Sequence, residues 1–244
     1  MEPHHNGTRA PLILRHPAAG WRAAYIGSGT LGIIGIGLLA LGVGVMVRGS
    51  VWPGIFVAAA ACVILVLFLY TLRDASARRH WRIAVEPDGL VLDLPRHRSI
   101  VAPMNEVHTR LGFDEIDAIE TRLEAYRILG TVNMHRIYAL KLRNGDAILL
   151  GEDRAQGTGM AMDFLAGAAE IIARHGGLEI RDQGMVKGRG GLFSVLFSAR
   201  PPREAPSLPA AEQSALWRGA ARTGRLVFLL SAVVLALVAL SMFS

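Results

Sequence analysis

Three long runs without charged residues constrain this chain more than any other feature of its sequence. Residues 23–47, 51–72 and 226–243 contain no Asp, Glu, Lys or Arg. About 20 apolar residues are enough for a helix to cross the hydrocarbon core of a bilayer. We therefore predict three transmembrane helices. The first run is too long for a cleavable signal peptide, and no small-residue cleavage site follows it.

The amino-acid composition also favours a position of these runs inside a lipid bilayer. Hydrophobic residues make up 52% of the chain but aromatic residues only 7%, so the apolar excess lies in small and aliphatic residues. That balance is typical of membrane helices. The single cysteine, Cys62, lies inside the second run, which excludes a disulfide framework and a thiolate metal site within this sequence.

Arginines beside the runs predict the orientation, because positive residues near membrane helices favour the cytoplasmic side. Three of the flanks carry the arginines Arg9, Arg15, Arg22, Arg73, Arg78, Arg79, Arg82, Arg218, Arg222 and Arg225. The short turn between the first two runs has only Arg48. We expect the tail at 1–22 and the segment after the second run to be cytoplasmic and the C-terminus to lie outside. The expected location is a bacterial inner membrane with an anionic inner leaflet.

Small residues in the first run predict close helix packing. They recur every seven positions on two faces, and close backbone approach drives helix association in lipid. The predicted helix-packing positions are Ser28, Gly32, Gly35, Gly37, Gly42 and Gly44. One face would pack on the second run, and the other on the third run or on another copy of the chain. The alternative is that glycine is simply common in membrane helices. The uncharged runs argue against a proton relay or ion pathway.

Residues 73–182 change to the pattern of strands. Alternating residues around a Pro-Asp-Gly turn predict a β-hairpin over 81–94. A second hairpin is predicted over 137–150, because Asn144-Gly145 is a favoured type I′ turn. Further strands are expected over residues 99–102, 114–123 and 178–181.

One amphipathic helix closes this segment. Apolar residues recur on one face between Met160 and Ile172, and Gly176-Gly177 ends the helix. Strands followed by one helix predict a small antiparallel β-barrel or curled sheet capped by that helix. The expected fold class is a membrane α-helical protein with three transmembrane helices and an α+β cytoplasmic domain.

The order of these elements resembles a known family. A transmembrane hairpin leads into Trp81-Arg82-Ile83 and Asp88-Gly89-Leu90, followed by an acidic strand at 114–120, the Asn144-Gly145 hairpin and the closing helix. This is similar to bacterial membrane proteins that carry a PH-like domain. The resemblance covers about residues 51–181, and the third run departs from it. It implies a partly open barrel used for binding or assembly, without catalysis and without a shared ligand site.

Two features after residue 182 are candidates for the membrane interface. Residues 183–209 form a Gly/Pro-rich linker with an apolar patch at Leu192, Phe193, Leu196 and Phe197. The patch either dips into the inner leaflet or packs against protein. Residues 210–225 predict a helix that continues into the membrane. Its interface residues are Trp217, Arg218, Arg222 and Arg225. These arginines could instead serve only to set the topology.

No catalytic constellation is visible. His97, His108, His135 and His175 lack the spacing of metal ligands. An acidic strand could in principle supply a general acid and base, but we interpret it as a solvated face paired with Arg122, Arg127 or Arg136. Its acids are Asp114, Glu115, Asp117, Glu120 and Glu124. We predict no cofactor, no metal and no catalytic site.

The net charge of +6 does not indicate nucleic acid, because arginines alternate with acids and no aromatic-basic platform is present. The leading hypothesis is a non-enzymatic membrane protein whose PH-like domain is a docking or assembly module. Its partner would be another membrane protein or a second copy held through the first helix. One alternative is a sensor of an anionic lipid headgroup or small ligand, bound through Arg96, Arg98, Lys141 or Arg143. The other is an enzyme that acts on a membrane substrate.

Overall fold

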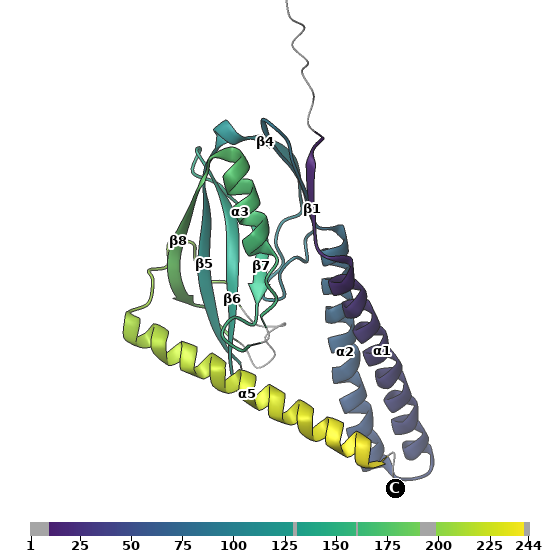
Figure 1. Ribbon diagram of the computed structural model, residues 1–244. Coiled ribbons are helices and arrows are strands. Elements are labelled where there is room, and N and C mark those ends of the chain that lie inside the picture. The colour runs from purple at the N-terminus through teal and green to yellow at the C-terminus, as the bar shows by residue number, and fades with distance from the viewer. Residues whose placement is uncertain (1–9, 129–130, 160, 191–198, 242–244) are drawn as a thin grey trace, which may run out of the picture. The chain divides into compact units, whose positions relative to one another are not determined.

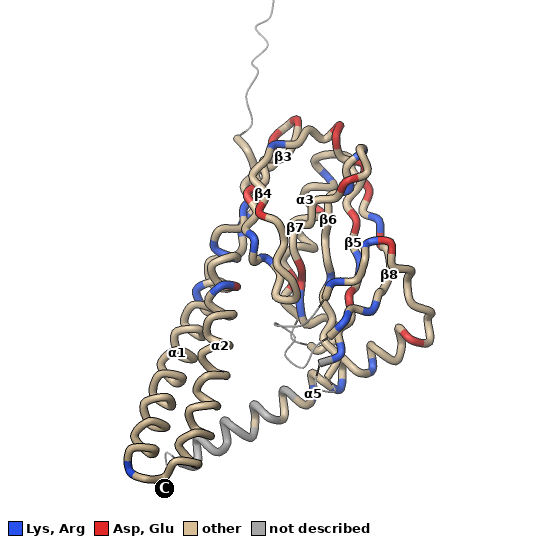
Figure 2. Tube along the Cα trace, turned by 180° about the vertical axis from the view of Figure 1, so that it is seen from behind, with Lys and Arg blue, Asp and Glu red and all other residues tan. Residues whose placement is uncertain are grey.

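The computed structural model describes residues 10–128, 131–159, 161–190 and 199–241 (Figure 1). The chain divides into two compact units. The helical unit comprises Leu12–Ala84 and Val91–Thr109. The sheet unit comprises Met1–Pro11, Val85–Leu90 and Arg110–Ser244. Lys, Arg, Asp and Glu are sparse along the two long helices of the helical unit and frequent on the strands of the sheet unit (Figure 2).

Two long antiparallel helices dominate the helical unit. Helix α1 (Ala18–Val47) and helix α2 (Val51–His80) are both long and apolar enough to cross a membrane, as predicted for the first two of the three runs. Helix α2 continues past the predicted end at residue 72. The extension is polar, and an ion pair of 3.0 Å between Arg78 Nε and Asp74 Oδ2 at i, i+4 supports it.

The third apolar run lies in helix α5 (Ala210–Ser241), which is one continuous helix. Among the described residues, only α1 and α2 meet the length and hydropathy required of a membrane span. The structure therefore shows two such helices where the sequence predicts three. Most side chains of residues 226–243 lie outside the described part of the chain.

The first of two sheets has the strand order β1-β2-β3-β4. Its strands are β1 (Leu12–Arg15), β2 (Arg82–Val85), β3 (Gly89–Leu94) and β4 (Val107–Gly112). Strands β2 and β3 confirm the first predicted hairpin. The strand predicted at 99–102 is wrong: Ser99 Oγ accepts the Val101 N–H at 3.2 Å, a local turn that replaces strand pairing. Strand β4 was not predicted because its polar residues give no apolar alternation.

The second sheet lies wholly within the sheet unit and has the order β7-β6-β5-β8. A 3₁₀ turn, η1 (Phe113–Glu115), leads into it. Its strands are β5 (Ile116–Ile128), β6 (Thr131–Leu142), β7 (Ala147–Arg154) and β8 (Glu179–Lys187). Strands β5, β6 and β7 pair antiparallel, which confirms the hairpin at Asn144-Gly145, whereas β8 pairs parallel with β5. The predicted type I′ turn is wrong: Gly145 has a positive φ of 98° but Asn144 does not, and the Gly145 N–H donates to the Leu142 carbonyl oxygen at 3.0 Å.

The prediction of an antiparallel β-barrel is therefore wrong. The described strands form two four-stranded sheets and no closed barrel, and one pair is parallel. The reason is helix α3 (Leu165–Gly176), which carries the chain from the β7 edge to the β8 edge. A parallel pair needs such a crossover. Strand β8 also extends to Lys187, so residues 183–187 belong to the sheet and not to a linker.

Helix α3 is held at its start by a carboxylate from the sheet. Asp153 Oδ1 accepts the N–H groups of Phe164 and Leu165 at 2.9 Å, and Oδ2 accepts that of Ala166 at 3.0 Å. Burial raises the pKa of Asp153, and these three hydrogen bonds oppose the shift. The helix ends at Gly177, whose φ of 62° is left-handed.

The N-terminal half of α5 belongs to the core of the sheet unit. Leu216 and Ala220 pack into one buried cluster with Leu123, Ala125, Val132, Met134 and Met185. The Val132 N–H donates to Thr223 Oγ1 at 2.9 Å, which fixes the helix to the start of β6. Leu216 and Ala220 of the segment predicted as a juxtamembrane helix, 210–225, thus contribute to the hydrophobic core of the sheet unit.

Candidate functional site

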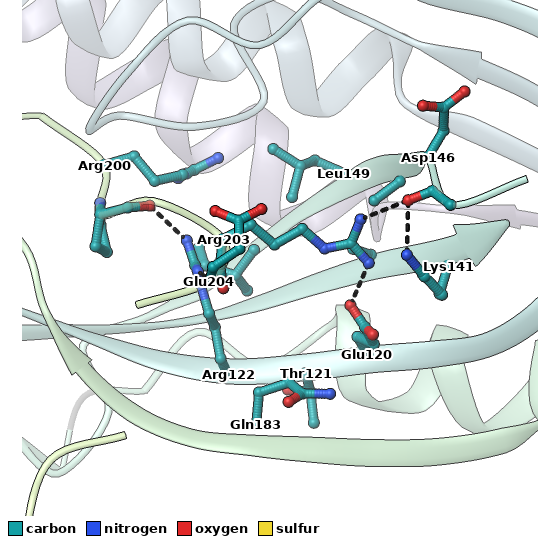
Figure 3. A pocket seen from close by; sticks show the side chains of 15 residues that line it. Glu120, Thr121, Arg122, Lys141, Asp146, Leu149, Gln183, Arg200, Arg203 and Glu204 are labelled. Carbon is teal, nitrogen blue, oxygen red and sulfur yellow. Dashed lines mark hydrogen bonds and ion pairs between the residues drawn. The ribbon is translucent and has the colours of Figure 1, made fainter. Parts of the chain in front are cut away.

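An open groove of about 600 Å³ crosses strands β5, β6 and β7 of the sheet unit (Figure 3). We name it the strand groove. Its apolar lining residues are Ile137, Ala139, Ala147 and Leu149. Its charged lining residues are Glu120, Arg122, Lys141, Asp146, Arg200, Arg203 and Glu204. Strands supply the apolar floor, and residues 200–204 form one wall.

Charges at the rim of the strand groove are held by partners within the chain (Figure 3). Arg203 Nη2 lies 2.6 Å from Glu120 Oε2. Lys141 Nζ donates to the carbonyl oxygen of Gly145 at 2.6 Å, and Arg203 Nη1 reaches the same oxygen at 3.4 Å. The rim is therefore a preorganised polar frame.

A buried carboxylate lies behind this rim. Glu124 is fully buried, and its Oε1 accepts from Arg122 Nη2 at 2.6 Å and from Arg122 Nε at 2.9 Å. Its Oε2 accepts the Tyr126 hydroxyl at 2.5 Å and lies 3.3 Å from Arg200 Nε. Burial and the adjacent Glu124 raise the pKa of Tyr126. The sequence interpretation of a solvated acidic face is wrong for Glu124, although its pairing with Arg122 is confirmed.

A second glutamate joins the same network. Glu152 Oε1 accepts from Arg154 Nε at 2.9 Å, and Oε2 lies 3.4 Å from Arg200 Nη2. His135 Nδ1 is 3.5 Å from Glu152 Oε1. We name Arg122, Glu124, Tyr126, Glu152, Arg154 and Arg200 the buried ionic network. Buried carboxylates need such partners, because an unpaired one would be strongly destabilising.

The network also fastens the segment that walls the groove. Arg122 donates to the carbonyl oxygens of Pro201 and Pro202 at 2.9 Å and to that of Arg203 at 3.2 Å. Its guanidinium thus bridges Glu124 and this backbone. Arg122 therefore links the network to the wall of the groove, and the carboxylates of the network are paired with arginines rather than presented as a free acid, base or nucleophile.

The described residues contain no group of three or more His, Cys, Asp and Glu that could hold a metal ion. Of the four histidines singled out in the sequence, His97 and His108 line the same hollow, while His135 lies beside Glu152. The hollow that His97 lines has a volume of about 520 Å³, lies in the helical unit and is also lined by Arg73 and Arg96. Burial, and then these two arginines, lower the pKa of His97.

The structure does not assemble the four residues predicted to bind an anionic ligand. Arg98 is buried and donates to the carbonyl oxygens of Pro95 and Asn105, both at 2.7 Å, so it holds a loop in place. Arg96 lines the hollow of the helical unit and Lys141 lines the strand groove. Arg143 is exposed and lines neither.

The predicted helix-packing residues separate into two faces of α1. Ser28, Gly32, Gly35 and Gly42 are buried. Gly32 faces Phe68, Gly35 faces Leu65, and Gly42 faces the backbone of Ala58 and Gly54 in α2. Gly37 and Gly44 are exposed, and among the described atoms nothing lies within 4 Å of where their Cβ would stand.

The predicted membrane-interface residues also divide. Leu192, Phe193, Leu196 and Phe197 lie outside the described residues. Trp217, 37% exposed, packs on Gly157, whose φ is +77° and where a Cβ would come within 2.6 Å of the indole ring. It therefore helps to dock α5 on the sheet unit.

Arginines of α5 form a second feature of the sheet unit. Arg218 and Arg222 line a hollow of about 560 Å³ together with Arg127 of β5. Arg225 is exposed and does not line it. The sequence analysis missed Arg127 as a partner of the helix arginines, because no local pattern relates positions so far apart in the chain.

Comparisons with known proteins give no relative for this chain: no protein-family model matches it, and no curated protein or solved structure is significantly similar. Function must therefore be inferred from the geometry alone.

Proposed function

We propose that this chain is a non-enzymatic membrane protein whose sheet unit docks other membrane proteins through the strand groove. The proposal depends on one observation: the charged side chains at the rim of the groove are already fixed before any partner binds. Of the apolar floor of the groove, Ala147 and Leu149 are half-buried and reachable, whereas Ile137 and Ala139 are buried. Glu120, Lys141 and Arg203 at the rim are already held by partners in the chain. A preorganised surface loses little conformational entropy when a partner binds. The carboxylates of Glu120, Glu124 and Glu152 are paired with arginines, which suits a binding surface better than a catalytic acid or base.

The proposal includes a membrane layout. Helices α1, α2 and the apolar half of α5 would cross a bacterial inner membrane, with the sheet unit in the cytoplasm and the C-terminus outside. The arginine-rich flanks support this orientation. Helix α5 runs without a break from its docked half into its apolar half, which would hold the sheet unit at the membrane surface. Tethering raises the effective concentration of the groove near membrane partners. The resemblance to PH-like membrane proteins stays a prediction within this proposal.

Cysteine labelling tests the layout. In a Cys62→Ala background, an impermeant maleimide added to intact cells is expected to label Ser50→Cys and Ser244→Cys. Asn144→Cys, in the exposed β6–β7 turn, is expected to react only after the cells are opened. Protection of Ser244→Cys with normal labelling of Ser50→Cys would remove the third crossing and leave the first two.

Blocking the strand groove tests the docking role. Ala147→Arg places a long side chain among the floor residues, and we expect a loss of at least about tenfold in the recovery of a specific partner, equivalent to about 1.4 kcal/mol. The matched control is Gly167→Arg on α3, which is exposed and has nothing described within 4 Å of its Cβ position. Proteins that co-purify with the full chain in mild detergent are quantified by mass spectrometry. Partners retained equally by both variants would exclude the groove as the docking surface.

A further inference from the structure

Three arginines meet where α5 leaves the core of the sheet unit. Arg127 of β5 and Arg218 and Arg222 of α5 line one hollow of about 560 Å³, which we name the arginine site. The lining residues that the structure describes include no Asp or Glu. Within the described part of the chain, none of the three guanidinium groups has an ion pair or hydrogen bond. This differs sharply from the buried ionic network, where every charge has a partner.

The fold holds these arginines together firmly. Arg127 pairs with Val132 across the β5–β6 ladder. Val132 is bonded through its N–H to Thr223 Oγ1 at 2.9 Å, and Gly219 lies so close that a Cβ there would come within 2.6 Å of the Val132 side chain. The helix therefore cannot slide along the strand without losing these contacts. Arg218 and Arg222, four residues apart, share one side of the helix.

Arg127, Arg218 and Arg222 are exposed, so water weakens their mutual repulsion, and an anion bound among them would turn the remaining repulsion into attraction. Guanidinium groups match phosphate oxygens by paired N–H donors, so phosphate is the anion that this residue type suits best. A hollow of this volume is in the range of small-molecule sites. The chemistry of the arginine site therefore favours a phosphate group.

The position along α5 identifies the source of that phosphate. Leu226 also lines the hollow, and it is 50% exposed. Phe228 and Leu229, which follow in the same helix, are 71% and 60% exposed. Large apolar side chains exposed in this way are suited to lipid. The arginine site thus lies where α5 changes from residues packed on the sheet to exposed apolar residues. In the proposed crossing of α5, this position would be at the level of the phospholipid headgroups.

We propose that the arginine site binds the phosphate of an anionic phospholipid in the cytoplasmic leaflet. This inference rests on the proposed crossing of α5, but it goes further than setting topology. Arg127 belongs to a strand and flanks no membrane run, whereas Arg225 flanks the third run equally well and does not line the site. A topology signal would use Arg225 and not Arg127. A headgroup site would use Arg127 and not Arg225.

The test uses the full chain in nanodiscs of phosphatidylcholine with a minor fraction of fluorescent phosphatidylglycerol. Energy transfer from the protein to this lipid measures its enrichment. An arginine that donates hydrogen bonds to the phosphate contributes more than one that only adds charge near the surface, so Arg127→Gln and Arg222→Gln are each expected to weaken binding about tenfold. Arg225→Gln is the matched control, expected to change binding less than about twofold.

Three results would overturn the proposal. Equal weakening by Arg127→Gln and Arg225→Gln would reduce the effect to general surface charge. Unchanged binding in Arg127→Gln would remove the site. Full competition by inorganic phosphate in solution would assign the arginine site to a free anion rather than to lipid. Labelling of Ser244→Cys in the same variants reports the crossing of α5 separately, so a failed site and a failed topology can be distinguished.

Discussion

Replacing Glu124 by alanine is expected to lower the free energy of unfolding of the sheet unit by about 3 to 5 kcal/mol. Glu124 is fully buried and accepts hydrogen bonds from Arg122 and Tyr126, while Arg200 lies 3.3 Å away. The truncation would leave two guanidinium groups buried without this counter-charge. Arg122 also holds residues 201–203 by their carbonyl oxygens, so the wall of the strand groove should loosen as well.

Hydrogen exchange of the full chain in detergent, read by mass spectrometry, measures this effect locally. Faster exchange is expected in β5, β7 and residues 199–205. Tyr126→Phe keeps both charge partners of Glu124 and should cost only about 1 to 2 kcal/mol. Glu170→Ala, on the exposed face of α3, is the control and should stay within about 0.5 kcal/mol of the wild type. If Glu124→Ala exchanged no faster than Glu170→Ala, the network would have no structural importance.

Replacing Gly42 by leucine is expected to disrupt the packing of α1 on α2. A Cβ at Gly42 would lie 2.9 Å from the Ala58 nitrogen and 3.0 Å from the Gly54 carbonyl oxygen. Both neighbours are backbone atoms of a helix, so neither can turn aside as a side chain can. Forced overpacking typically costs 1 to 3 kcal/mol. A loss of about 2 kcal/mol corresponds to a fall of roughly 4 to 8 °C in Tm for a chain of this size.

Gly44→Leu is the matched control for this prediction, because it adds the same side chain two residues away on an exposed face. Thermal unfolding in detergent should give Gly44→Leu a Tm close to that of the wild type. Equal losses in the two variants would contradict close packing at Gly42. The mass of the complex in detergent, measured for Gly44→Leu, also tests whether the second small-residue face holds another copy of the chain.

The sequence by itself determined the elements whose signal is local. Charge-free runs predicted α1 and α2, because a side chain that faces lipid cannot carry charge at low cost. The Asn144-Gly145 dipeptide predicted the β6–β7 hairpin, since both residues favour turns, although the turn is not of the predicted type I′. Helical spacing and a paired glycine predicted α3 to within a few residues. The small residues of α1 predicted its contact with α2, although only one of the two faces is used there.

Only the tertiary structure decided which segments meet. The parallel pairing of β8 with β5 depends on the path of α3 across the sheet, and no alternation within β8 encodes it. The burial of Glu124 depends on arginines from β5 and from residue 200, so the strand looked like a solvated face. Arg127 meets Arg218 and Arg222 only because Thr223 and Gly219 dock α5 on β6. The physical reason is the same in all three cases. The periodicity of apolar residues predicts which face of a segment is buried. Strand pairing and the burial of a charge depend on partners that are distant in the chain.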